Sequence, residues 1–283
     1  MKTASLFRPL ACAALLAVPV HAQLYSLHGD GVKKADRVVE KADYSDYELV
    51  WNDEFDKDGR PDPAKWNYEN GFVRNKEAQW YQPENAYCKD GMLIIEGRKE
   101  KRPNPRYNPE GKDWRTTRKE AEYTSASLTT QGKFSWQYGR FEIRARFSPR
   151  EGMWPAFWTL GVREGWPRCG EIDIMEHVGN QLNRIFGTLH YPGRSGGNAD
   201  GTSVMIPNAT TEFHIYSMEW NASTIKIYVD NQLFFTYNNN ANSPFNQNFF
   251  FIMNVAMGGN FGGTIDPNVT NATMEVDYIR VYQ

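Results

Sequence analysis

Residues 141–147 read FEIRARF, a strict alternation of apolar and charged side chains. Successive side chains of a β-strand point to opposite faces, so this pattern predicts a strand whose two phenylalanines, isoleucine and alanine share one buried face. The glutamate and the two arginines between them then lie on the opposite face. This strand is the clearest local sign of an all-β fold.

The same texture extends along the chain on both sides of this stretch. Residues 224–229 and 233–237 flank a short polar turn and predict a hairpin. Residues 249–256 are apolar throughout, which indicates a strand buried on both faces, and residues 274–282 predict a last strand. No segment keeps helical periodicity for three turns. Residues 47–283 therefore predict a single domain built as a two-sheet antiparallel β-sandwich, or jelly roll.

Composition excludes several other classes of protein. Hydrophobic residues make up 40% of the 283 residues, aromatic residues 14%, and the mean hydropathy is −0.66. A helical membrane protein or a coiled coil needs long aliphatic or heptad runs, and a disordered chain lacks aromatic residues to bury. The nine tryptophans exceed what a core of this size requires, which suggests that some have another use.

The first 22 residues have the features of a secretory signal peptide. Lys2 and Arg8 precede an apolar run at 10–20, which is too short to span a membrane, and small residues surround a cleavage point after Ala22. The sequence therefore predicts export, to the periplasm or the medium. Surface anchoring through a lipid on Cys12 is the alternative. Residues 23–46 are polar and mixed in charge and predict a leader or linker.

Removing residues 1–22 takes the formal charge from −2 to −4. A weakly acidic chain is a poor candidate for binding nucleic acid, and we expect a monomer. Cys88 and Cys169 are the remaining cysteines; two free thiols are favoured, with a disulfide as the alternative.

The segment 98–119 is unusual because it carries nine lysines and arginines against three acids. A solvated loop is the simpler interpretation. The alternative is an ordered loop at the rim of a cleft that touches the substrate.

Residues 170–177, GEIDIMEH, carry the candidate chemistry. In a strand, Glu171 and Asp173 share one face while the isoleucines between and after them point into the core. A regular strand would put Glu176 on the core face, where an unpaired charge costs several kcal/mol. A one-residue β-bulge near Met175 would return Glu176 to the face of the other two carboxylates.

With that bulge, the Cα atoms of Glu171 and Glu176 are expected roughly 13 Å apart. Two inward-leaning glutamates can bring their carboxyl groups to about 5 to 6 Å, the separation of a retaining glycosidase pair. Asp173, between them, can share a proton or a hydrogen bond. A calcium site or a structural strand remain alternatives for the acidic pattern.

Tryptophans cluster just before this strand, at Trp154, Trp158 and Trp166. The apolar face of a sugar ring stacks on an indole, so Trp beside carboxylates suits a polysaccharide cleft. Because strand residues alternate, only some of these rings are expected to face outward.

Taken with the rest of the chain, these stretches resemble glycoside hydrolase family 16, in particular its laminarinase-like members. The resemblance covers about residues 47–283. Its matching stretches are 50–55 (VWNDEF), 75–81 (NKEAQWY), 138–142 (YGRFE), 154–158 (WPAFW), 170–177, 187–191 (GTLHY), 254–260 (NVAMGGN) and 276–282 (VDYIRVY).

The resemblance implies a jelly roll with a concave substrate cleft and endo-hydrolysis of a β-1,3- or mixed β-1,3-1,4-glucan with retention. It makes Glu171 the nucleophile, Glu176 the general acid/base and Asp173 an assisting carboxylate. Its sugar-contacting positions correspond to Asn75, Trp166 and His190, although a lone His at a strand end can also be purely structural.

The resemblance implies no cofactor for catalysis. It does imply a structural calcium ion, held by the backbone of Glu54 and Gly91 and by the carboxylate of Asp277.

Two departures leave the substrate open. Ala78 replaces a larger aliphatic residue, and the basic segment 98–119 would favour sulfate, as in relatives that cut agar or carrageenan. The continuation Met175-Glu176-His177 is closer to laminarinases. A non-catalytic β-glucan-recognition protein on the same scaffold is a third hypothesis, but such binders lack one or both glutamates, and this chain keeps both.

Overall fold

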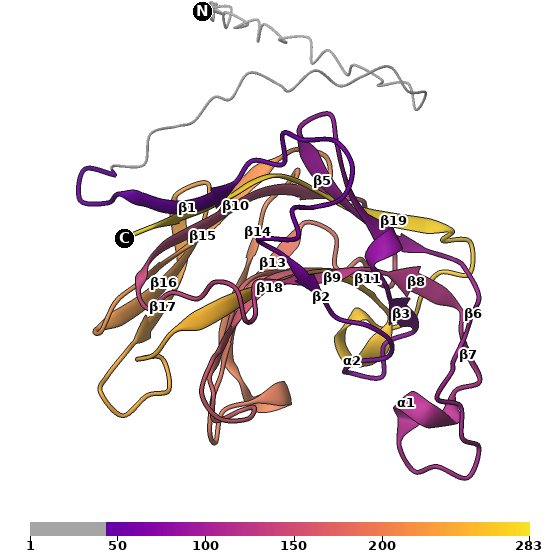
Figure 1. Cartoon of the computed structure of the whole chain (residues 1–283). Helices are drawn as coiled ribbons and strands as arrows, with labels where there is room; N and C mark the ends of the chain where they lie inside the picture. Colours follow the sequence, from indigo (N-terminus) through magenta and orange to yellow (C-terminus); the bar gives the residue numbers. More distant parts are fainter. Residues whose placement is uncertain (1–43) are drawn as a thin grey trace, which may run out of the picture. The chain divides into compact units, whose positions relative to one another are not determined.

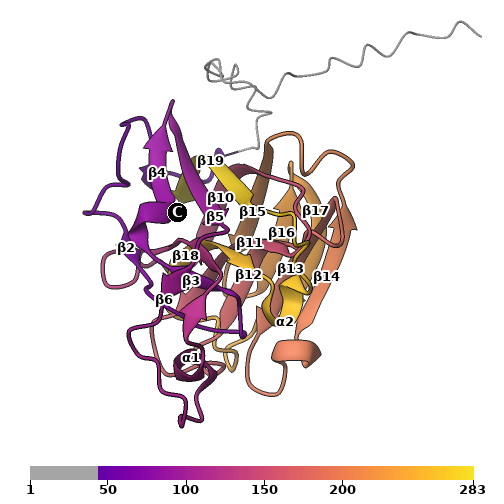
Figure 2. The same cartoon turned by 90° about the vertical axis from the view of Figure 1, so that its right-hand side faces the viewer.

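The computed structural model describes residues 44–283. Two antiparallel sheets pack face to face, as Figure 1 and the turned view in Figure 2 show. The first sheet has the strand order β17 (Gln232–Asn238), β16 (Thr224–Val229), β15 (His214–Trp220), β10 (Gly139–Phe147), β19 (Asn271–Tyr282), β5 (Met92–Arg98), β8 (Tyr123–Ser125) and β3 (Gln79–Tyr81). On this sheet β1 (Leu49–Asp53) pairs with β19, and β4 (Ala86–Lys89) pairs with β5.

The second sheet carries the acidic strand. Its order is β14 (Asp200–Met205), β13 (Arg184–His190), β12 (Glu171–His177), β11 (Met153–Gly161), β18 (Phe249–Met257), β9 (Ser127–Thr129) and β2 (Asn67–Tyr68). The strand pairs are antiparallel apart from β3 and β8, which run parallel. The predicted two-sheet sandwich is therefore confirmed.

Helical structure in the described chain is limited to single turns. These are α1 (Trp114–Thr117), α2 (Gly259–Gly262), η1 (Pro83–Asn85) and η2 (Gly196–Asn198). None of the helices among residues 44–283 has the length and apolar character needed to cross a membrane.

The core forms from the alternating side chains that the sequence predicts. Phe141, Ile143, Ala145 and Phe147 of β10 are all buried in it. β18 is buried along its whole length, as predicted, because each of its two faces packs in a different hydrophobic cluster. Its odd-numbered residues, such as Phe251, enter the core between the sheets, whereas Phe250 and Ile252 pack with Trp158 on the other face.

The segment 98–119 is ordered and forms a flap. It contains β6 (Arg102–Pro103), which pairs with β7 (Glu120–Ala121), and α1 lies between them. The flap packs through Trp114 against a small buried cluster that includes Phe72 and Trp80. We call residues 98–121 the flap below.

The structure tests the prediction about the two cysteines, whereas the prediction about the first 22 residues falls outside the described chain. Cys88 and Cys169 are free and buried, so the favoured interpretation is confirmed. The signal peptide, Cys12 and residues 23–43 lie outside the described residues. Tyr44, placed at the end of the leader, stacks on Tyr282 at 4.7 Å between ring centroids, so the packed domain begins no later than this residue.

Candidate active site

The strand β12 contains the predicted bulge. Asp173 and Glu176 lie opposite Trp158 and Ala156 of β11, and opposite Thr188 and Phe186 of β13. Three steps along β12 thus match two steps on each neighbour, which is the definition of one inserted residue. Ile172, Ile174 and Met175 are fully buried in the core. The bulge lets both isoleucines and all three carboxylates keep their preferred faces.

Each glutamate accepts a hydrogen bond from a tryptophan. The Trp166 indole nitrogen lies 2.5 Å from Glu171 Oε2, and the Trp154 indole nitrogen lies 3.0 Å from Glu176 Oε1. Thr188 Oγ1 adds a longer contact of 3.4 Å to Glu176 Oε2. Two of the three predicted tryptophans therefore position the carboxylates directly, in addition to any stacking on sugar.

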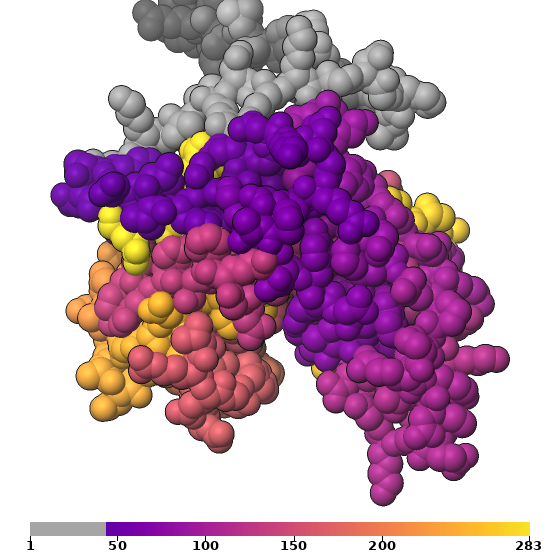
Figure 3. All heavy atoms as spheres, viewed as in Figure 1, coloured from indigo at the N-terminus to yellow at the C-terminus, as the bar shows by residue number. Residues whose placement is uncertain are grey.

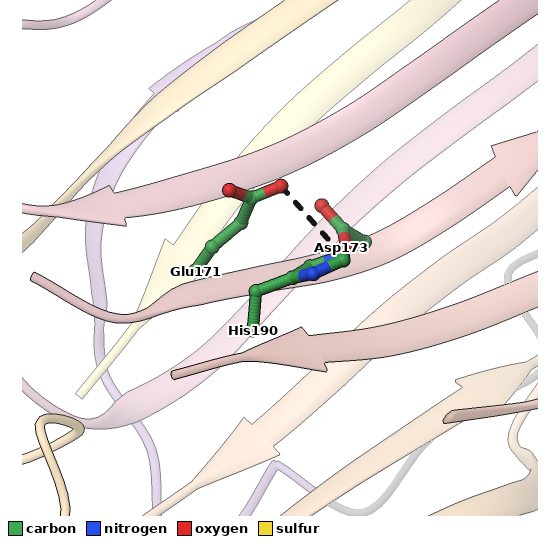
Figure 4. A group of neighbouring side chains, drawn as sticks. All are labelled: Glu171, Asp173 and His190. Atoms are coloured by element: carbon green, nitrogen blue, oxygen red, sulfur yellow. Dashed lines mark ion pairs between the residues drawn. The ribbon is translucent and has the colours of Figure 1, made fainter. Parts of the chain in front are cut away.

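His190 converges with Glu171 and Asp173 from the neighbouring strand (Figure 4). It lies directly opposite Glu171 in the pairing of β12 with β13. Its Nε2 atom is 3.2 Å from Asp173 Oδ2 and 4.0 Å from Glu171 Oε1. The predicted catalytic residues and His190 thus form one cluster.

Burial raises the pKa of every carboxyl group in this cluster. Burial and then the charge of Asp173 raise the pKa of Glu171 to about 8, and burial and then Glu171 raise the pKa of Glu176 to about 7. Burial and then Glu176 also raise the pKa of Asp173 well above its usual range. The three groups interact, so they titrate as one set, and burial shifts that set toward the protonated form. General acid/base chemistry with a nucleophile needs one protonated and one ionised carboxyl group, so one member of the set must release its proton.

The cluster lies in a cleft with a volume of about 1110 Å³. In Figure 3 the surface is hollowed between the magenta flap and the salmon-coloured segment that follows β13. Trp166 is the most open aromatic residue there, with 53% of its surface exposed. Its position supports the prediction of a stacking surface beside Glu171.

Trp158 has a different environment from Trp166. It lines the cleft but is only 6% exposed, and its indole nitrogen donates to Asn254 Oδ1 at 2.9 Å. The Arg74 guanidinium lies 4.9 Å from its ring centroid. This placement does not support the prediction of a stacking surface at Trp158, because Arg74 and the strand neighbours already cover the ring.

Asn75 also lines the cleft, on a loop with positive φ at Asn75 and Lys76. Arg118 of the flap donates to the backbone carbonyl of Lys76 at 2.7 Å and to that of Glu77. On the other side, the backbone N–H of Asn260 donates to the backbone carbonyl of Asn75 at 2.9 Å. The basic flap therefore supports a cleft loop, and Arg115 brings it to the rim itself.

Sequence reasoning missed the aromatic wall next to Glu176. Phe261 in α2 stacks edge-on against Trp154 at 5.4 Å and against Phe186 at 5.1 Å, and all three line the cleft. A signal was present, since Phe261 stands among glycines, of which Gly258 and Gly263 have positive φ. An aromatic side chain in such a turn is far from the core between the sheets, so it is expected to pack at the surface or in a cleft.

Two groups of residues are candidates for metal binding. Ligand atoms of Glu171, Asp173 and His190 lie within 4.8 Å of one another. Whether a cation could use them depends on which ring nitrogen of His190 carries the proton, because only the unprotonated nitrogen ligates.

The calcium set implied by the resemblance fits a cation poorly. Asp277, its only carboxylate ligand, accepts a hydrogen bond of 2.8 Å from Arg144, whose positive charge already balances it. The other two ligands would be backbone carbonyls, with Glu54 just after β1 and Gly91 in the turn before β5. A structural calcium ion stays a prediction, and no catalytic step depends on it.

The raised pKa of Glu171 makes stability depend on pH. The folded chain holds this proton more tightly than the unfolded chain, so the contribution is complete below about pH 4.5 and is lost as pH rises through about 8. Glu171→Gln removes the buried ionisation. We expect the variant to melt at least about 3 °C above the parent at pH 9, with little difference at pH 4.5, in thermal unfolding followed by circular dichroism.

Glu164→Gln is the matched control for that experiment. Glu164 is exposed and pairs with Arg168 in the loop before β12, so its replacement removes a carboxylate without relieving burial. A difference in melting temperature between Glu171→Gln and the parent that stays the same at every pH would contradict the buried ionisation.

Comparison with known proteins agrees with this geometry. The profile described as "Glycosyl hydrolases family 16" matches residues 76–280. A beta-glucanase of Rhodothermus marinus is 43% identical over 260 residues, which covers 84% of this chain and 85% of the relative.

A solved structure and a second relative extend the comparison. The catalytic domain of an endo-1,3-beta-glucanase (laminarinase) from Thermotoga petrophila superposes with a TM-score of 0.75 and 38% identity, over 84% of this chain and 98% of the other. A keratan-sulfate endo-1,4-beta-galactosidase of Sphingobacterium multivorum is 33% identical over 84% of this chain and 56% of its own length.

Proposed function

Since the chain belongs to glycosyl hydrolases family 16, we propose that it is an endo-β-1,3(4)-glucanase that hydrolyses β-glucan with retention of configuration. The observation that carries the proposal is the bulged strand β12, which puts Glu171, Asp173 and Glu176 on one face, with Glu171 and Glu176 lining the cleft. The naming of the Rhodothermus and Thermotoga relatives as glucanases supports the substrate class.

In the first step, the Glu171 carboxylate attacks the anomeric carbon and Glu176 gives its proton to the glycosidic oxygen. The bond between the sugar and the leaving chain breaks, and a glycosyl ester forms on Glu171. Trp166 and His190 orient Glu171 for this attack, and the Trp154 N–H orients Glu176.

In the second step, Glu176 takes a proton from water, which attacks the same carbon from the side that the leaving chain vacated. The ester bond breaks and Glu171 regains its charge. Two inversions give net retention. Asp173 holds its proton or shares it with Glu171, which limits repulsion among the three acids as their charges change.

Electrostatics favour a neutral glucan over a sulfated galactan. Among the described residues, two arginines line the cleft, and both are already paired: Arg74 with Glu69 and Arg115 with Asp113 at 2.7 Å. The carboxyl groups of the catalytic cluster add no positive charge, so the cleft has no positive surplus. A sulfate ester would therefore gain little there.

A galactan remains the second candidate because one relative is named as a keratan-sulfate endo-1,4-beta-galactosidase. The deciding experiment is product analysis on laminarin, lichenan, barley glucan, agar and carrageenan. We expect oligosaccharides from the first three with the β-anomer formed first, read by proton NMR. Products from agar or carrageenan alone would overturn the glucanase proposal, and an α-anomer formed first would overturn retention.

We also propose that residues 1–22 direct export and that the packed domain, which begins no later than Tyr44, acts as a monomeric catalytic domain. The predicted cleavage site and the packed sandwich support these two statements. N-terminal sequencing of the exported protein and light scattering test them.

A further inference from the structure

The turn that joins β13 to β14 contacts the catalytic cluster through His190. We propose that this turn, locked by Asp200, holds His190 in the tautomer with its proton on Nε2 and so keeps divalent cations out of the cluster. Asp200 is then a positioning residue. Its effect on hydrolysis rests on the proposed function, whereas the tautomer and the exclusion of metal do not.

The tautomer follows from one hydrogen bond. The backbone N–H of Gly196 points at His190 Nδ1, with 3.0 Å between the two nitrogens. A backbone N–H can only donate, so Nδ1 must accept, and a neutral imidazole then carries its proton on Nε2. His190 Nε2 lies 3.2 Å from Asp173 Oδ2 and 4.0 Å from Glu171 Oε1. The hydrogen bond at Nδ1 alone therefore assigns the tautomer, and it leaves the Nε2 proton on the side of the two acids.

Asp200 holds the turn in the shape that places Gly196. Its Oδ1 atom accepts from Arg194 Nε at 2.8 Å, and its Oδ2 atom accepts from the Tyr191 hydroxyl. Asp200 lies opposite Leu189 in the pairing of β13 with β14, one residue before His190. Asp200, at the end of the turn, thereby holds Tyr191 at its start and Arg194 within it.

The other hydrogen bonds of the turn are local: Tyr191 and Arg194 exchange two backbone hydrogen bonds at 2.8 and 2.9 Å, and the Asn198 side chain donates to the Gly193 carbonyl at 3.0 Å. Residues 193–197 include three glycines, and a side chain added at any of them would meet open space. Gly196 has φ of +57°, a conformation that other residues rarely adopt. Replacing Asp200 leaves those local bonds but removes the two that fix Tyr191 and Arg194 to the start of β14, and the glycines then allow the turn to shift.

The lock also acts against a metal ion at a cluster that has metal-ligand spacing. Glu171, Asp173 and His190 offer atoms within 4.8 Å of one another, a spacing that suits Zn²⁺. Ligation would need the lone pair of Nε2 and would move the proton to Nδ1, where it would face the Gly196 N–H. Two donors would then oppose each other, so the turn disfavours the metal-binding tautomer.

Ring ¹⁵N NMR of the full chain tests the tautomer directly. His190→Gln identifies the His190 signals among the five histidines. We expect the parent to show a protonated Nε2 and an accepting Nδ1, and Asp200→Ala to show a mixture. Arg194→Ala releases the other side of the lock and should act in the same way. A protonated Nδ1 in the parent, or an unchanged tautomer in both variants, would overturn the proposal.

Calorimetric titration with ZnCl₂ tests the exclusion of metal without any assay of activity. We expect Asp200→Ala to bind Zn²⁺ at least about tenfold more tightly than the parent, and the gain to vanish in the double variant with His190→Gln. Glu120→Gln is the matched control, because it breaks an exposed ion pair with Lys101 in the flap. Equal affinity in Asp200→Ala and the parent would refute the lock, even if the chain proved not to cut glucan.

Discussion

Replacing Glu171 with glutamine is expected to lower kcat on laminarin by about 10⁴-fold while leaving the affinity for the glucan nearly unchanged. Glutamine keeps the size of the side chain and can still accept from Trp166, so the cleft is preserved. It cannot form the glycosyl ester. The loss therefore falls on the chemical step, and stacking on Trp166 continues to hold the substrate.

Reducing-sugar release measures kcat, and calorimetry with a laminarin oligosaccharide measures affinity. Glu164→Gln again serves as the control, since its carboxylate pairs with Arg168 outside the catalytic cluster. Activity of Glu171→Gln within tenfold of the parent would exclude Glu171 as the nucleophile. One preparation of Glu171→Gln serves both experiments. This variant is expected to lose activity and, at pH 9, to be more stable than the parent.

Replacing Glu176 with alanine is expected to lower kcat on laminarin by about 10³-fold, with a much smaller effect on the first step for an aryl glucoside with an acidic leaving group. Such a leaving group departs without a proton, so the glycosyl ester on Glu171 still forms. Water then attacks slowly because no base is present. Azide needs no base and fits the space that the side chain leaves, so it should restore turnover.

The configuration of the azide product separates the two glutamates. Glu176→Ala should give a β-glycosyl azide, since azide attacks the anomeric carbon from the side opposite the ester bond to Glu171 and displaces that ester. Glu171→Ala should give an α-azide by direct attack where the carboxylate had been. If the α-azide came from Glu176→Ala and the β-azide from Glu171→Ala, the two assignments would be reversed. If azide rescued neither variant, the result would count against double displacement. Proton NMR of the products distinguishes the anomers.

Alternation and length were enough to predict most of the sandwich. Residues 141–147 and 249–256 fall within β10 and β18, and their buried faces follow the predicted pattern. The bulge in β12 could also be predicted, because a regular strand would bury the charge of Glu176. These features depend on the local sequence and on the cost of misplacing a side chain.

Long-range partners could not be predicted in the same way. The covering of Trp158 by Arg74 joins residues 84 positions apart, and the contact of Phe261 with Trp154 joins the short helix α2 to the distant strand β11. Alternation places a side chain on a face but does not indicate what lies above it. The flap shows the same limit, since its charge suggested sulfate, whereas its arginines are used on Glu77, Asp113 and neighbouring rings.

The inserted residue in β12 also bears on how acidic residues can be spaced along a strand of this scaffold. Glu171 and Glu176 are five positions apart, and the bulge absorbs one of these positions, so the two side chains share a face. Deleting a residue at the bulge would leave a regular strand in which the two acids, now four positions apart, again share a face. The number of residues between two acids that must act together therefore indicates whether the strand that carries them is bulged or regular.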